Sequence, residues 1–116
     1  VAVVLPGATM GLGMPFAPAR KLLNAGACLA ISTDWNPGTA PMGNLLLQAA
    51  VIGASEKLST AETFAALTYR AAHALRMHDR GTLAVGQQAL LQAYPAADYR
   101  DILYYQGSMK PWRVWC

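Results

Sequence analysis

The sequence predicts an α/β segment followed by a small β-rich tail. Residues 1–5 and 28–32 are short, continuously apolar runs, as in strands buried on both faces of a parallel sheet. A helical stretch separates them, with Pro18 suited to its first turn and Gly26 to the position just past its end. A strand, a helix and a strand within about 30 residues match the size of a right-handed βαβ unit. The residues themselves therefore favour the α/β fold class.

The other segments of the first part follow from local composition. Residues 7–16 hold three glycines and no charge, which favours a long loop, and the Pro, Gly, Asn and Asp residues of 33–41 predict another. The apolar run 44–52 predicts a short helix. Residues 59–62, Ser-Thr-Ala-Glu, form a capping box that opens a longer helix. The i, i+3, i+4 spacing predicts that its buried stripe comprises Ala61, Phe64, Ala65, Thr68, Ala71, Ala72 and Leu75.

A change of pattern marks the tail. Residues 81–86 predict a turn, a short strand and a second turn, and residues 90–94 and 113–116 predict further strands. The aromatic side chains Tyr104, Tyr105, Trp112 and Trp115 are expected to form a packing cluster. The chain is thus divided into residues 1–76 and residues 77–116.

Composition narrows the class of protein. Of the 116 residues, 54% are hydrophobic and only 13% are charged, about half the usual share of charged residues, which excludes disorder and suits part of a larger protein. Prolines and glycines interrupt the uncharged first 19 residues, so no membrane span is expected. Nine scattered Lys and Arg residues give no footprint for nucleic acid or an anionic membrane. Two cysteines without a disulfide framework indicate a reduced, cytoplasmic setting.

Chemistry is expected after the second strand, because parallel sheets bind ligands at the carboxyl ends of their strands. Asp34 lies at such an end and is the only acidic residue among the first 55. Its carboxylate could bind a metal ion or take a proton from water; the alternative is that it caps a turn. Asn36 and the backbone of Gly38 and Thr39 could donate hydrogen bonds to an anionic ligand, although Asn-Pro-Gly also suits an ordinary turn.

Other polar, aromatic or reactive residues are weaker candidates for a functional site. His73 is expected to be structural or on the surface, and His78 to lie in a solvated turn. Cys28 begins a buried strand and is expected to be inert. Trp35 is expected to pack rather than to stack on a substrate. From the residues alone, the sequence indicates an α/β segment with one suggestive carboxylate.

One motif resembles a known family. Residues 32–41, Ser-Thr-Asp-Trp-Asn-Pro-Gly-Thr-Ala-Pro, resemble the segment that follows the eighth barrel strand of imidazolonepropionases, which are metal-dependent amidohydrolases. Similar stretches flank this motif and extend the resemblance over essentially the whole chain: residues 5–8, 58–62, 71–75, 79–86, 102–107, 110–111 and 114–115.

The resemblance implies a more specific fold. Residues 1–76 would be the C-terminal part of a TIM (β/α)8 barrel, with its last two strands and helices, and residues 77–116 would be strands of a small β-sandwich. A complete barrel needs about 250 residues. The family's metal-binding histidines are therefore expected upstream of Val1, and the isolated chain is expected to be inactive.

The resemblance also implies an activity, the hydrolysis of 4-imidazolone-5-propanoate to N-formimino-L-glutamate in histidine degradation. One divalent metal ion, Zn or Fe, would be bound by Asp34, which would also move the proton. Asn36, Gly38 and Thr39 would hold the substrate. The implied protein is a cytoplasmic homodimer with a small-molecule substrate and no nucleic-acid or membrane partner.

Two other interpretations remain open at the level of sequence. One is a different amidohydrolase that acts on a cyclic amide or deaminates a heterocycle, which would share Asp34 but not the following loop. The other is a truncated, non-catalytic module.

Overall fold

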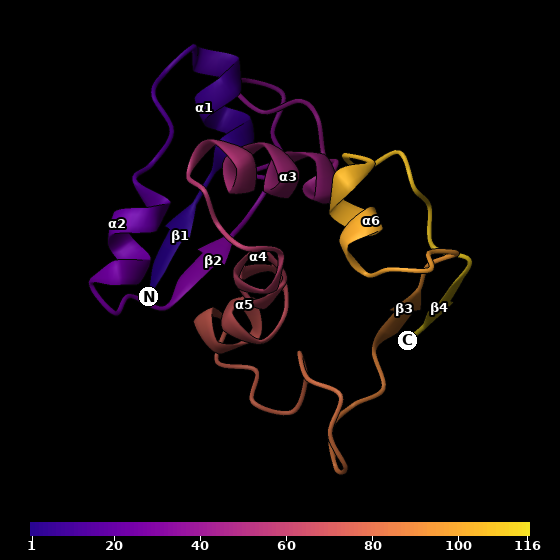
Figure 1. The fold of residues 1–116 in the computed structure, drawn as a ribbon. Helices are drawn as coiled ribbons and strands as arrows, with labels where there is room; N and C mark the ends of the chain where they lie inside the picture. The colour runs from indigo at the N-terminus through magenta and orange to yellow at the C-terminus, as the bar shows by residue number, and fades with distance from the viewer.

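The computed structural model describes all residues, 1–116 (Figure 1). In chain order the elements are β1 (Ala2–Val4), α1 (Pro6–Leu12), α2 (Ala19–Asn24), β2 (Leu29–Ile31), α3 (Leu45–Ser55), α4 (Thr60–Leu67), α5 (Tyr69–Ala74), β3 (Leu91–Ala93), α6 (Arg100–Tyr104) and β4 (Arg113–Trp115). None of the helices has the length and apolar character that crossing a bilayer would require.

The first part is a parallel α/β unit. β1 and β2 pair in parallel, with Val3 opposite Ala30, so the predicted strand–helix–strand arrangement is confirmed. α4 and α5 pack against β2, and α2 contacts the same strand (Figure 1). The core between them is small and aliphatic: Val4, Ala19, Leu29, Ile31, Ala49, Ile52 and Ala66.

The segment after β1 is a helix, so the prediction of a loop over residues 7–16 is wrong for residues 7–12 and holds only for residues 13–16. Pro6 stands at the start of α1, where its fixed φ suits a helix, and Gly13 ends it in the left-handed region with φ 64°. Gly7 and Gly11 are present because neighbouring chain leaves no room for a Cβ at either position. The glycines that suggested flexibility instead permit close packing.

The helix predicted after residue 59 begins as expected and then breaks. The Ser59 hydroxyl accepts a hydrogen bond from the Glu62 amide (3.1 Å), and the Glu62 carboxylate accepts one from the Ser59 amide (2.8 Å), so the capping box is confirmed. At Thr68, with φ −117° and ψ −102°, the helix is interrupted, and α4 and α5 follow one another as separate helices.

The buried face of these two helices also differs from the prediction. The buried residues are Thr63, Ala66 and Ala72, of which only Ala72 belonged to the predicted stripe, whereas Leu75 is 67% exposed. The prediction applied one helical period across the break at Thr68, which shifts the phase. In addition, alanines occur on several faces of these helices, so the sequence pattern does not single out one apolar face as the buried one.

The tail consists of a two-stranded antiparallel sheet and one short helix. β3 pairs with β4, with Gln92 opposite Val114, which confirms two predicted strands. No strand forms over residues 81–86, where Leu83 and Val85 are fully or nearly fully exposed, because no neighbouring strand is there to pair with them. The expected aromatic cluster is also wrong. Tyr104 and Tyr105 contact each other, with ring centroids 5.2 Å apart, but Tyr104 and Trp112 are about three-quarters exposed.

α6 is an element that the sequence did not predict, since five residues are too few for a clear helical period. It packs against α3, and the Asn44 side chain donates a hydrogen bond to the Gly107 carbonyl (3.0 Å) just after it. The tail therefore contacts the α/β unit. The division between residues 76 and 77 into two domains stays a prediction.

Candidate functional site

The candidate site is the strand-end loop, residues 33–43, which follows β2 and ends where α3 begins. The carboxyl ends of β1 and β2 lie together, since the Ser32 amide donates to the Val4 carbonyl (3.0 Å). Asp34 is the second residue of the loop, exposed, in the left-handed region with φ 49°. A non-glycine residue in this region is uncommon, although Asp tolerates it better than most.

The Asp34 carboxylate has no hydrogen bond and no ion pair within the chain. Its backbone is nevertheless fixed, because the Asn36 side-chain amide donates to the Asp34 carbonyl (2.6 Å). The loop thus holds a carboxylate in a defined place while leaving both of its oxygens free. This arrangement suits a ligand group or a proton acceptor.

Asn36 organises the loop from inside. Its side-chain oxygen accepts hydrogen bonds from the amides of Gly38 and Thr39, both at 2.9 Å, and its side-chain nitrogen also contacts the Thr39 hydroxyl (3.3 Å). The Asn36 backbone amide donates a hydrogen bond to the Ala40 carbonyl (3.1 Å), and Ala40 is buried. The Asn36 side chain therefore satisfies three backbone groups of the turn, the Asp34 carbonyl and the Gly38 and Thr39 amides, and its own backbone amide satisfies a fourth.

The four predicted site residues lie together, but most of their hydrogen-bonding groups are already in use. The amides of Gly38 and Thr39 and the side chain of Asn36 bond to one another. The Thr39 hydroxyl accepts from Asn36 and retains its own hydrogen as a donor. In this conformation, the groups free to meet a ligand are the Asp34 carboxylate and the Thr39 hydroxyl.

Three contacts that the sequence did not predict stabilise the loop, one of them within the loop and two with helices α1 and α3. The Trp35 indole donates to the Pro41 carbonyl (3.1 Å). Gly11 of α1 lies directly against the Thr39 carbonyl. The buried Gln48 of α3 donates to the Met42 carbonyl (2.8 Å). In the sequence, the one indication that Gln48 has a structural role is that it is a polar residue within the apolar run 45–52.

For a metal ion, the chain offers one ligand at this loop. No three His, Cys, Asp or Glu side chains of the 116 residues come close enough together to hold a metal ion. Asp34 fits as a single carboxylate ligand because its oxygens are free and exposed. The remaining ligands would have to come from outside these residues.

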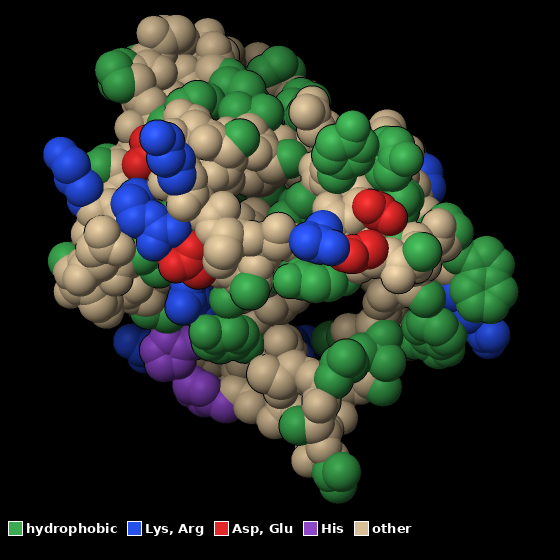
Figure 2. Space-filling model, in the orientation of Figure 1, with side chains coloured by type: hydrophobic (Ala, Val, Ile, Leu, Met, Phe, Trp, Pro, Cys, Tyr) green, Lys and Arg blue, Asp and Glu red, His purple; other side chains and the backbone are tan.

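The two histidines lie elsewhere. His73 and His78 are exposed, with ring centroids 5.9 Å apart, and appear side by side in purple in Figure 2. They line a hollow of about 380 Å³ together with Cys28, which precedes β2 and so lies at the end of the sheet opposite Asp34. The expectation that His73 and His78 are surface residues is confirmed, and neither reaches the strand-end loop.

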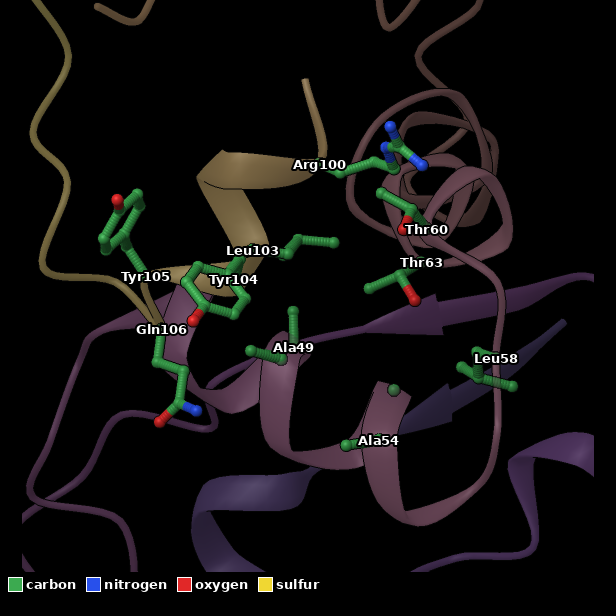
Figure 3. Close-up of a pocket in the computed structure, with 12 residues that line it drawn as sticks. Ala49, Ala54, Leu58, Thr60, Thr63, Arg100, Leu103, Tyr104, Tyr105 and Gln106 are labelled. Carbon is green, nitrogen blue, oxygen red and sulfur yellow. The ribbon is translucent and has the colours of Figure 1, made fainter. Parts of the chain in front are cut away.

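A second hollow, of about 750 Å³, lies between α3, α4 and α6 (Figure 3). Its wall includes Ala54 and Leu103, together with the Arg100 side chain. Arg100 is paired with Asp98 (2.6 Å), and its guanidinium holds the pKa of Asp98 at about 2. No residue of the strand-end loop lines this hollow, so it is separate from the candidate site.

Comparison with known proteins finds relatives along almost the whole chain. A sequence model of the amidohydrolase family matches residues 4–103. An imidazolonepropionase from Deinococcus deserti is 44% identical over 99% of this chain and 29% of its own length. An imidazolonepropionase from Deinococcus radiodurans is 42% identical over 92% of the chain and 27% of its own length. The chain therefore spans less than a third of these relatives.

The structure has a similar neighbour as well. The crystal structure of an adenosine deaminase from Xanthomonas campestris with bound zinc superposes with a TM-score of 0.76 and 26% identity, covering 97% of this chain and 30% of that one. The relatives confirm the resemblance to imidazolonepropionases, and the family match extends from β1 to α6. The chain belongs to the amidohydrolase family.

Proposed function

We propose that this chain is part of a metal-dependent hydrolase that opens the ring of 4-imidazolone-5-propanoate to give N-formimino-L-glutamate. The observation that carries the proposal is the strand-end loop, which presents a free Asp34 carboxylate within a stretch 44% identical to an imidazolonepropionase. In the intact protein, β1 and β2 would be the last two strands of a TIM barrel. β3 and β4 would belong to a small β-sandwich.

Asp34 would have two tasks. One carboxylate oxygen would bind a divalent metal ion, Zn or Fe; zinc is the ion bound in the adenosine deaminase neighbour. When bound, such an ion polarises a carbonyl and makes water more acidic. The other Asp34 oxygen would take a proton from the attacking water and return it to the ring nitrogen as the carbon–nitrogen bond breaks. The hydroxyl oxygen stays on the carbonyl carbon, so atoms and charge balance.

The turn formed by Asn36, Gly38 and Thr39 would hold the substrate. The Thr39 hydroxyl is the group with a free donor, so it is the direct contact that the loop offers without rearrangement. Contacts from Asn36 or from the amides of Gly38 and Thr39 would require the exchange of hydrogen bonds that they now make to one another. The contribution of Asn36 in the present geometry is the shape of the turn.

Deamination of a heterocycle is the second candidate, because the structural neighbour is an adenosine deaminase. It is less favoured, since that likeness has 26% identity against 44% for the imidazolonepropionase. Assaying the intact, metal-loaded protein with both imidazolone propionate and adenosine separates the two candidates.

The role of Asp34 is tested by Asp34→Asn in the intact protein. Turnover of imidazolone propionate should fall about 10³-fold, because the change removes both a ligand charge and a proton acceptor. Asp101→Asn, which changes a carboxylate outside the loop, serves as the control and should leave turnover and metal content unchanged. Near-normal activity and metal content in Asp34→Asn would overturn the assignment.

A further inference from the structure

We propose that Gln48 is a positioning residue that couples the turn after β1 to the strand-end loop after β2. The inference rests on the proposed function in one respect only, namely that the strand-end loop meets substrate. Nothing in the motif of residues 32–41 includes this residue, which lies in the second turn of α3.

Both ends of the Gln48 amide are used. Its oxygen accepts a hydrogen bond from the Gly7 amide (2.9 Å), which lies 41 residues away at the start of α1. Its nitrogen donates to the Met42 carbonyl (2.8 Å) near the end of the strand-end loop. The two partners have opposite polarity, so a side chain here must both accept and donate. Glutamine does this, whereas a carboxylate could not donate and an ammonium group could not accept.

Burial makes these two bonds hard to replace. Gln48 is 0% exposed, and so water cannot readily satisfy the Gly7 amide or the Met42 carbonyl if the side chain is removed. Space is equally restricted on the side of α1, because a Cβ added at Gly7 would lie 2.6 Å from the Gln48 side-chain nitrogen. Gly7 and Gln48 are therefore matched to one another.

A second contact joins the same two segments. Gly11, one helical turn beyond Gly7, lies directly against the Thr39 carbonyl. α1 thus meets the strand-end loop at Thr39, and Gln48 links the start of α1 to Met42. Together these contacts fix residues 39–42 relative to the end of β1, so a shift of α1 would displace the Thr39 hydroxyl and the Asn36 side chain that bonds to it.

The test uses the intact protein with three substitutions. Gln48→Leu removes both hydrogen bonds at similar volume. Gly7→Ala leaves α3 unchanged but pushes on the Gln48 amide, and it serves as a second variant if Gln48→Leu does not fold. Ile52→Val is the matched control, since Ile52 is also 0% exposed on α3 but belongs to the aliphatic core and has no polar side-chain group to bond the loop.

Two readouts are needed. Hydrogen exchange of the Gly38 and Thr39 amides should become about tenfold faster in Gln48→Leu and Gly7→Ala, and should be unchanged in Ile52→Val. KM for imidazolone propionate should rise about tenfold in the same two variants, with bound metal unchanged and kcat altered less.

Unchanged loop exchange in both variants, or equal changes in Ile52→Val, would overturn the proposal. An intact wild-type protein that does not hydrolyse imidazolone propionate would overturn the proposed function instead, while the exchange measurement would still decide the role of Gln48.

Discussion

The strand-end loop and residues 79–88 are both irregular, yet they are ordered in different ways. In the strand-end loop, Ala40 is buried, and contacts from α1 and α3 hold the backbone on two sides. In residues 79–88, Leu83 and Val85 are exposed, and the ends are joined by the Gln88 amide, which donates to the Asp79 carbonyl (2.7 Å). The strand-end loop is held by helices on two sides, whereas residues 79–88 contact α5 at Gly81 and are otherwise held by bonds within the segment.

The difference shows that turn-rich composition does not indicate how firmly a segment is held. Asn36 gives the strand-end loop its shape, but burial and the contacts with neighbouring helices hold that shape in place. Under the proposed function the loop presents the Asp34 carboxylate to a substrate, and both kinds of contact would then matter, because a small displacement at a site lowers activity strongly.

The largest expected difference between the strand-end loop and residues 79–88 is in the rate of proteolysis. With subtilisin under native conditions, cleavage within residues 81–87 should be at least about tenfold faster than cleavage within residues 34–42, because local opening costs little free energy where few contacts must break. Mass spectrometry of the early fragments measures the two rates. Equal rates would show that the helix contacts do not restrain the strand-end loop.

Removing the Asn36 side chain should make the strand-end loop less well ordered, and so more like residues 79–88. Asn36→Ala deletes the acceptor for Gly38 and Thr39, and kcat/KM of the intact protein should fall by an amount equivalent to about 1.5–3 kcal/mol, with metal content unchanged. Asn36→Asp keeps that acceptor but loses the donor to the Asp34 carbonyl, and should have an intermediate effect. Parallel loss of metal and activity in Asn36→Ala would instead indicate a general folding role for the loop.

A stabilising change is expected just before residues 79–88. Arg76 follows α5 in the left-handed region with φ 57°, while the Met77 amide donates to the Ala72 carbonyl (2.9 Å), as in a glycine-terminated helix. Arg76→Gly should raise the free energy of unfolding by about 0.5–1 kcal/mol, because it removes the steric cost of a Cβ there. Arg76→Ala keeps the Cβ, so an equal gain in urea unfolding of that variant would assign the effect to charge.

The smallest effect is expected from an ion pair remote from both segments. Arg20 of α2 contacts Glu62 of α4 (2.6 Å), and this hydrogen bond, with those from Ser59, holds the pKa of Glu62 at about 2 instead of 4.5. The pair is partly exposed, so Glu62→Gln should lower the free energy of unfolding by at most about 1 kcal/mol. The lowered pKa means that this contribution is complete above pH 4.5 and fades as pH falls toward 2.

Urea unfolding of wild type and Glu62→Gln at pH 7 and at pH 3 measures the difference. Asp101→Asn is the control, since the Asp101 side chain makes no hydrogen bond and no ion pair within the chain. A difference between wild type and Glu62→Gln that grows on acidification would contradict the sign expected from the lowered pKa.

The sequence by itself determined the local features of this protein. Two apolar runs predicted β1 and β2, the capping box predicted the start of α4, and the motif around Asp34 predicted both the family and the place of the carboxylate. These features depend on side chains within a few residues of one another, and so a local pattern is enough to indicate them.

Only the tertiary structure decided which segments touch. α1 is a helix despite its glycines because Gly7 and Gly11 meet chain that is distant in sequence, and no local pattern reveals those contacts. The buried face of α4 and α5 depends on the break at Thr68. The role of Gln48 exists only where Gly7 and Met42 converge on one buried amide, because a hydrogen bond in the core requires that its partners be brought together by the fold.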